Sequence, residues 1–321
     1  MPASIEYLQK CAAQTGHQLT MLEKVTRLGE IALEVTCHAA LRDSLALKGG
    51  TAINLCFGAP TRLSIDLDFN FIGCADREGM LRARPEIEKA LFDLVRRLGY
   101  KVQQSAQAAA SRKFYATYRS VLGHDDRIEL DINYLWRTPL AGLREAELWQ
   151  PGELARPRVL VVSEEELWVG KLLAFLDRTT PRDAWDVSRM HSIAPTVASS
   201  PSLRRWFVAM SFMLDHPVWN YDRARVSARL TSHAIESQLH PMLTRNDRPD
   251  AAELFELAWN VAGPLVTPTP REAEFTAHAQ QAKLDPSLIF GNDTNAAQRF
   301  MTHPQVMWKL ENLRRHRERL P

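Results

Sequence analysis

The sequence predicts an α+β protein, with a mixed sheet flanked by helices and followed by a C-terminal helical bundle. Segments rich in β-forming residues alternate with helical patterns up to about residue 162. From residue 164 onward the pattern is almost wholly helical and is broken mainly at prolines. The chain has 321 residues, 45% of them apolar, which is enough for one large core or two moderate ones. We therefore expect two domains, residues 1–162 and 163–321.

The elements of the first domain follow from hydrophobic periodicity. Apolar residues at helical spacing predict one long helix, or two in tandem, over 20–46. Glycines interrupt the pattern before a short helix at Thr51–Cys56, and an amphipathic helix is expected over 78–98. Alternation of polar and apolar residues predicts strands over 63–72, 101–104, 113–121, 127–135 and 158–162.

Composition excludes several classes of protein. No apolar run approaches the roughly 18–20 residues that span a bilayer, and no secretory signal is visible. Four scattered cysteines without a CxxC pair argue against a zinc site and favour reduced thiols in a cytoplasmic protein. The net charge of +2 is too close to neutral to indicate a nucleic-acid partner by itself. We expect a cytoplasmic protein with no membrane partner.

Two aspartates on the predicted strand 63–72 form the first candidate site. Asp66 and Asp68 are two residues apart, so their carboxylates share one face and lie within about 7 Å. Like charges this close raise each other's pKa, unless a cation lies between them or water reaches both. Mg²⁺ fits, because it prefers oxygen ligands and typically takes one or two carboxylates plus substrate phosphates. An amphipathic edge strand with two solvated aspartates remains the alternative on this feature alone.

A glycine turn upstream of the aspartates favours a metal site over a solvated edge strand. Gly49 and Gly50 allow backbone N–H groups to approach a phosphate, and Thr51 adds a hydroxyl at the start of a helix. A pair of glycines alone is weak evidence, since any tight turn uses them. Followed by a strand with Asp-x-Asp, the turn predicts a triphosphate cradle beside a metal site.

A third carboxylate is expected from a neighbouring strand. Asp131 lies between Leu130 and Ile132, and Glu129 shares its face and is the fallback. Three carboxylates can hold two metal ions, one activating the attacking hydroxyl and one stabilising the leaving pyrophosphate. A surface strand residue is the alternative interpretation of Asp131.

These residues resemble the nucleotidyltransferase superfamily and, more narrowly, the AbiEii/AbiGii toxin family that includes the MenT toxins. The resemblance covers about residues 45–190; the helices after about residue 200 carry no motif that we can place. It is carried by four motifs: Lys48-Gly49-Gly50-Thr51-Ala52, then Arg62 to Phe69 (RLSIDLDF), then Val169 to Ala174 (VGKLLA), and Pro181 to Val187 (PRDAWDV).

The resemblance implies a polymerase-β-like fold and a site that uses Mg²⁺ (or Mn²⁺) and an NTP. Asp66, Asp68 and Asp131 would hold the metal, while Lys48, Gly49, Gly50 and Thr51 would hold the nucleotide. It also implies transfer of a nucleotide onto an acceptor that can be tRNA, by the toxin of a toxin–antitoxin or phage-defence pair with a cognate antitoxin. The helical domain would then complete the active site and bind the acceptor.

The later motifs have chemistry of their own. Lys171 lies among apolar residues and needs an anionic partner, such as a nucleotide phosphate, unless it is a snorkelling surface lysine. Asp183 and Asp186 can share one helical face. We expect Asp186 to orient Lys171 or to act as the base on the acceptor hydroxyl, and Asp183 to serve as a helix cap or a partner of Arg182.

Two residues just before the aspartates complete the set of candidates. Ser64 could bond to a nucleotide phosphate and Arg62 could neutralise one. Both are also compatible with simple polarity at the edge of a strand.

The leading hypothesis is nucleotide addition to the 3′ end of tRNA, which would block translation. Two alternatives stay open: nucleotidylation of a protein hydroxyl, and a non-catalytic NTP-binding protein on a decayed fold. The presence of the glycines and the aspartate pair argues against decay.

Overall fold

The computed structural model describes residues 3–318, so the outer ends of the two expected domains, residues 1–2 and 319–321, lie outside it. The chain forms two compact units. The first, called the sheet unit here, comprises Met1–Val162 and Glu236–Arg248, and the second, the helical unit, comprises Ser163–Ile235 and Pro249–Pro321. The returning segment 236–248 is held by backbone bonds, since Leu63 N donates to Met242 O at 2.8 Å and Arg245 N to Gly16 O at 3.1 Å.

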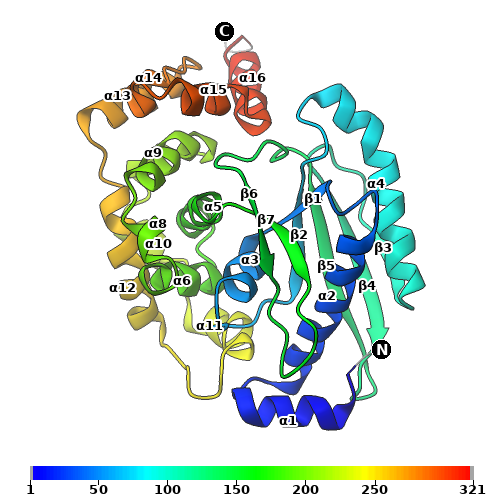
Figure 1. The fold of residues 1–321 in the computed structure, drawn as a ribbon. Coiled ribbons are helices and arrows are strands. Elements are labelled where there is room, and N and C mark those ends of the chain that lie inside the picture. The colour runs from blue at the N-terminus through cyan, green and yellow to red at the C-terminus, as the bar shows by residue number, and fades with distance from the viewer. Residues whose placement is uncertain (1–2, 319–321) are drawn as a thin grey trace. The chain divides into compact units, whose positions relative to one another are not determined.

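Within the described residues, the sheet unit contains a seven-stranded mixed sheet in the order β3-β4-β5-β2-β1-β7-β6 (Figure 1). The pairs β2–β5 and β1–β7 are parallel and all other neighbours are antiparallel. The strands are β1 (Leu45–Lys48), β2 (Asp66–Phe71), β3 (Lys101–Gln104), β4 (Ser111–Arg119), β5 (Asp125–Asn133), β6 (Leu143–Glu147) and β7 (Arg158–Val162).

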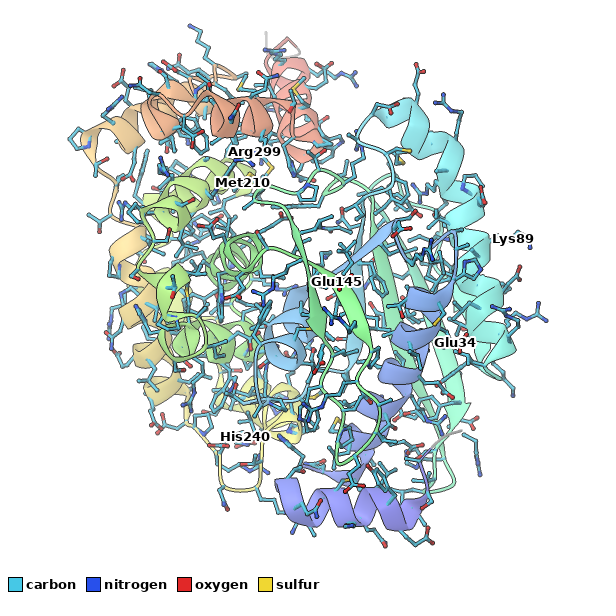
Figure 2. The ribbon with its side chains drawn as sticks, viewed as in Figure 1. Glu34, Lys89, Glu145, Met210, His240 and Arg299 are labelled. Carbon is cyan, nitrogen blue, oxygen red and sulfur yellow. The ribbon has the colours of Figure 1, made fainter. Side chains whose placement is uncertain are left out.

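Helices cover the two faces of this sheet differently. α2 (Leu19–Cys37) and α4 (Arg77–Arg97) pack against strands β3, β4 and β5, and α1 (Ile5–Thr15) packs on α2. The strand residues that alternate onto this side are buried and apolar, for example Phe114 on β4 and Leu130 on β5. The side chain of Lys89 points from α4 away from the sheet (Figure 2). α3 (Gly49–Cys56) follows β1 directly and packs against β1, β2 and β6.

The helical unit is organised around α5, which has apolar residues on all sides and is buried along most of its length. α6 and α9 pack against α5, and α12 packs against α6. No helix in residues 3–318 combines the length and apolar character that crossing a bilayer requires. The elements after β7 are α5 (Glu164–Asp177), α6 (Pro181–Ser188), α7 (Met190–Ile193), α8 (Pro195–Ala198), α9 (Pro201–Met210), η1 (Ser211–Met213), η2 (Val218–Asn220), α10 (Arg223–Ser227), α11 (Ser232–Gln238), η3 (His240–Met242), α12 (Ala251–Ala262), η4 (Gly263–Leu265), α13 (Pro270–Gln280), α14 (Ser287–Phe290), α15 (Thr294–Thr302) and α16 (Pro304–Glu318).

The α+β class with a mixed sheet is confirmed, but several elements differ from the sequence prediction, among them helix α1, which was not predicted. The helix expected over 20–46 ends at Cys37, and its last residues form strand β1, because a short buried apolar run has no period that separates helix from strand. Strand β2 begins at Asp66 and not at Leu63, so Ser64 lies just before the strand. Strand β6 was not predicted, since most of its residues are exposed and polar.

Candidate active site

The turn between β1 and α3 places the backbone of Gly49 close to Asp68, one of the candidate metal ligands. Gly49 has φ +72°, a conformation that side chains with a Cβ rarely adopt. A Cβ added there would lie 2.6 Å from Asp68 Oδ2, so the carboxylate of β2 occupies the space that a side chain would need. Lys48, the N-cap of α3, makes no side-chain capping bond. The start of α3 therefore presents backbone N–H groups beside Asp68.

Arg62, Ser64 and Thr51 form the second layer of this turn. A Cβ on Gly50 would lie 2.6 Å from Arg62 Nη2 and 3.3 Å from Ser64 Oγ. The hydroxyl of Thr51 lies 2.9 Å from Ser64 Oγ and donates a hydrogen bond to the carbonyl oxygen of Asp66. Arg62 and Ser64 are buried, at 2% and 4% exposure, so simple polarity at an exposed strand edge does not explain them. A buried guanidinium beside a helix start favours an anion there.

A row of four charged residues crosses the sheet next to this turn. In the strand register, Lys48 of β1 pairs with Asp68 of β2, which pairs with Asp131 of β5, and Asp131 pairs with Lys113 of β4. Residues that are paired directly across strands have their side chains on the same face. The order of charges along the row is therefore positive, negative, negative, positive, with the two carboxylates adjacent.

Asp131 is the residue of this row whose carboxylate is least satisfied. Its Oδ1 is buried and has no hydrogen-bond partner within the described part of the chain. Burial raises the pKa of Asp131 above its usual range, Lys48 opposes this rise, and the neighbouring charge of Asp68 adds to it. Such an orphaned buried acceptor fits a site that takes a cation.

Glu129, the fallback for the third carboxylate, has a different environment. It pairs in register with Asp66, but its side chain forms an ion pair with Lys113 of β4. Its charge is thus already balanced by a protein cation. The geometry favours Asp131 over Glu129 as the carboxylate that joins Asp68.

The carboxylates alone do not form a complete metal-binding site. No three His, Cys, Asp or Glu side chains among residues 3–318 are close enough together to hold a metal ion. Asp68 and Asp131 supply adjacent oxygen donors, and Asp66 lies one row further along the same face. Two carboxylates completed by substrate phosphates are the donor set that Mg²⁺ typically takes, so these residues fit such an ion together with a nucleotide.

A separate charged cluster lies within the helical unit and is almost fully buried. Lys171 of α5 lies 2.8 Å from Asp183 Oδ1 and 2.9 Å from Asp186 Oδ2, and the three side chains are 8%, 1% and 0% exposed. Both aspartates belong to α6, so this lysine holds two helices together. Its carboxylate partners lie in its own unit, and a part for Lys171 and Asp186 in nucleotide transfer stays a prediction of the sequence.

Asp183 combines the roles of helix start and ion-pair partner. It accepts bonds from Arg178 Nε at 2.8 Å and from Thr180 Oγ1 at 2.6 Å, and Thr180 is the N-cap of α6. Burial alone would raise the pKa of Asp183, but Lys171 and Arg178 more than offset this and hold the pKa well below its ordinary value. The expected arginine partner was Arg182, whereas Arg178 makes these bonds, because the turn after α5 brings it to the start of α6.

Sequence reasoning missed Lys113 and the position of Lys48 in the charged row. Lys113 lies on a strand that alternates polar and apolar residues, so its face could be predicted, but its pairing with Asp131 required the register of β4 on β5.

A mixed sheet that sets a glycine turn beside paired aspartates fits the nucleotidyltransferase class of proteins. Its fold is shared by MenT4, a nucleotidyltransferase toxin from Mycobacterium tuberculosis H37Rv, with a TM-score of 0.63, 18% identity and coverage of 93% of this chain and 98% of that one. JHP933 from Helicobacter pylori also matches, with a TM-score of 0.45, 17% identity and coverage of 83% and 99%. Among curated proteins, none matches the sequence.

The chain belongs to the family described as "Nucleotidyl transferase AbiEii toxin, Type IV TA system", whose model matches residues 31–256. The resemblance seen in the sequence is thereby confirmed. Membership makes the chain a nucleotidyltransferase toxin of a type IV toxin–antitoxin system, which implies an NTP as substrate and an antitoxin as partner.

The close approach of Gly49 to Asp68 predicts a site-specific effect of Gly49→Ala. The matched control is Gly58→Ala, because Gly58 also has a positive φ (+104°) but has open space around its Cβ position. Both variants lose about 1–3 kcal/mol through backbone strain. Only Gly49→Ala should also weaken NTP binding at least tenfold in a calorimetric titration. Equal NTP affinity in the two variants would show that the turn does not contact the nucleotide.

The unsatisfied carboxylate predicts opposite effects of two neutral substitutions on β5. A carboxyl whose pKa is higher in the folded than in the unfolded chain destabilises the fold at neutral pH, where it is ionised. In EDTA, Asp131→Asn should therefore raise the melting temperature by about 2 °C or more, while transfer falls more than about 100-fold. Glu129→Gln breaks the ion pair with Lys113, so the melting temperature should not rise and transfer should persist. The reverse pattern would make Glu129 the metal ligand.

The buried cluster predicts a large stability effect of Lys171→Met. Removing the lysine leaves two buried carboxylates with less compensation, and the free energy of unfolding should fall by about 3–5 kcal/mol in urea. Lys89→Met on α4 is the control, since Lys89 is 78% exposed and its loss should change little. If Lys171→Met is too unstable to purify, Arg178→Ala should show a smaller loss. Wild-type stability of both Lys171→Met and Arg178→Ala would contradict the role assigned to the cluster.

Proposed function

We propose that this toxin is a divalent-metal-dependent enzyme that transfers NMP from an NTP to the 3′ end of RNA, with tRNA as the acceptor, and thereby blocks translation. The observation that carries the proposal is the adjacent pair Asp68 and Asp131 beside the glycine turn of α3. Asp131 has a buried oxygen without a partner among residues 3–318. A nucleoside triphosphate with its cation would supply phosphate oxygens to the glycine turn and positive charge to the two carboxylates.

The glycine turn would bind the triphosphate. Backbone N–H groups at Gly49, Gly50 and Thr51 provide donors at the start of α3, and the buried Arg62 adds a positive charge next to Gly50. Lys48 is the last residue of β1 and the first residue of the charged row, so it lies next to the glycine turn. The hydroxyl pair of Ser64 and Thr51 fixes the turn against the start of β2.

Asp68 and Asp131, with Asp66 one row away, would hold Mg²⁺ or Mn²⁺. When bound, such an ion would neutralise charge on the phosphates and make the acceptor hydroxyl more acidic. In the transfer itself, the acceptor oxygen bonds to the α-phosphorus, the bond to the bridging oxygen of pyrophosphate breaks, and the hydroxyl proton leaves. The protein contributes positioning and electrostatic stabilisation, which dominate catalysis of phosphoryl-type transfers.

RNA as the acceptor is supported by the toxin role of the family, together with the need for a hydroxyl that can reach the carboxylates. The 3′ end of tRNA offers such a hydroxyl on a single-stranded segment. Addition of a nucleotide there would prevent aminoacylation and so stop protein synthesis, which suits a toxin that is kept in check by an antitoxin.

Labelled transfer tests the proposal. The protein is incubated with each of the four α-labelled NTPs, Mg²⁺ and total tRNA, and label is followed in RNA and in protein. Wild type should label tRNA, and Asp68→Asn should reduce the rate more than about 100-fold, because loss of even an outer-shell partner of a metal ligand costs about 10–100-fold.

The control and the contrary results are defined by the same assay. Asp43→Asn, in an exposed ion pair with Arg42, should transfer at the wild-type rate. Label in a protein in place of RNA would make a hydroxyl side chain the acceptor. Full transfer by Asp68→Asn would contradict the assigned site, and NTP binding without transfer would indicate an interaction protein.

A further inference from the structure

The outer face of strands β3, β4 and β5 carries an aromatic and cationic surface next to the charged row. α2 and α4 pack on the opposite, apolar side of these strands. On the outer side, Tyr115 of β4 pairs with Glu129 of β5, and Arg127 of β5 pairs with Thr117 of β4. Lys101 of β3 also pairs with Thr117, so it lies on this side too. We call the surface made by Lys101, Lys113, Tyr115 and Arg127 the outer strand face.

Tyr115 and Arg127 form a stacked pair on the outer strand face. The guanidinium carbon of Arg127 lies 5.1 Å from the centre of the Tyr115 ring. Arg127 is exposed, and within residues 3–318 its guanidinium forms no ion pair with a carboxylate. An exposed arginine is ordinarily satisfied by water, but here it also lies over an aromatic ring. The pair therefore presents an arginine and an aromatic ring together on one face of the sheet.

The remaining charges on this face are of both signs. Lys101 is exposed and forms no ion pair in the described part of the chain. Lys113 is 42% exposed and contacts Glu129, and Arg119 forms an ion pair with Asp125. Among the described residues of these strands, Lys101 and Arg127 are thus the cations of the face that have no carboxylate partner. Aromatic rings and arginine planes among lysines are what single-stranded nucleic acids bind, because bases stack on the planes and phosphates contact the cations.

The outer strand face is continuous with the carboxylates of the candidate site. Glu129 and Asp131 are two residues apart on β5, so the side chains of the charged row and the stacked pair share one face of the sheet. β4 is two strands away from β2, which is about 10 Å in the hydrogen-bonding direction. The glycine turn lies at the opposite end of the same row, on β1. A nucleotide bound at the turn and an acceptor lying on β4 and β5 would thus approach the carboxylates from opposite sides.

We propose that the outer strand face binds the single-stranded 3′ end of the acceptor RNA. Tyr115 and Arg127 stack on a base close to the terminal nucleotide, and Lys101 and Lys113 contact the phosphates. The inference rests on the proposed transfer to RNA and adds the surface that selects this acceptor. A single strand is required, because a base paired in a duplex cannot present its plane to a side chain.

Binding of a short RNA tests the inference without any transfer. The probe is a fluorescently labelled, single-stranded octaribonucleotide with a free 3′ hydroxyl, titrated by anisotropy at several KCl concentrations without NTP. Full-length wild type is compared with Tyr115→Ala, Tyr115→Phe and Arg127→Ala. Arg158→Ala is the matched control, because Arg158 is also an exposed strand arginine but lies on β7, paired with Glu145 of β6, which Figure 2 labels.

The stacking role gives the variants different signatures. Tyr115→Ala should weaken binding roughly 5- to 100-fold with no change in salt dependence, and Tyr115→Phe should retain wild-type affinity. Arg127→Ala should weaken binding and also reduce the slope of log affinity against log salt by about 0.7. In the transfer assay, Tyr115→Ala should raise the KM for tRNA while NTP affinity stays at the wild-type value. Arg158→Ala should match wild type throughout.

Failure of this inference differs from failure of the proposed function. If wild type labels tRNA but Tyr115→Ala and Arg127→Ala bind the octamer and tRNA as tightly as Arg158→Ala, the outer strand face is not the acceptor site and transfer to RNA stands. If wild type labels a protein, or binds no octamer and labels no RNA, the acceptor class is wrong and both proposals fall.

Discussion

The parallel pairing of β2 with β5 is the constraint on which the rest of the site depends. It sets Asp68 directly opposite Asp131, and a register shift of one residue would turn one of these carboxylates toward the apolar face under α2 and α4. Two adjacent carboxylates repel, so the pairing is unfavourable unless positive charge is supplied nearby. Lys48 and Lys113 flank the pair on the neighbouring strands. Gly49 is the residue whose missing side chain leaves room for the Asp68 carboxylate. The glycine turn, the strand order and the order of charges along the row thus all contribute to placing Asp68 beside Asp131.

Two buried acidic clusters in the described part of the chain compensate their negative charge in different ways. In the helical unit, Lys171, Arg178 and a threonine hydroxyl satisfy Asp183, and its pKa falls although it is buried. In the sheet unit, Asp131 keeps a buried oxygen without a partner, and its pKa rises. Folding energy is compatible with the first cluster, since buried charges that are paired and hydrogen-bonded hold helices in one arrangement. It does not explain the second, because an unsatisfied buried acceptor only destabilises the fold. A bound cation would account for this difference, and the same contrast is why we propose that Asp68 and Asp131 hold the metal.

The sequence predicted the features whose signals are local. The Asp66 and Asp68 alternation, the Gly49 and Gly50 turn and the strands 101–104 and 158–162 are patterns of a few residues, and the structure has these elements. What failed depended on pairing between distant segments. Strand β1 was predicted as the end of a helix, because a run of three buried residues has no usable period. The sequence already preferred Asp131 to Glu129 and offered Asp186 as a residue that orients Lys171, whereas the contacts of Asp183 with Lys171 and Arg178 needed the turn between α5 and α6. Strand register and helix packing depend on contacts between distant segments, so a pattern of a few residues cannot predict them.

The central claim is that Asp68 and Asp131 together hold a divalent cation, and its most direct test is a crystal structure with Mn²⁺ and a non-transferable NTP analogue. Anomalous scattering then locates the manganese independently of any assumption about the site. The account predicts an anomalous peak within about 2.3 Å of oxygens from both Asp68 and Asp131, with phosphate oxygens completing the coordination beside the turn at Gly49. Manganese bound elsewhere, or nucleotide bound at the turn while Asp131 contacts only protein groups, would contradict it.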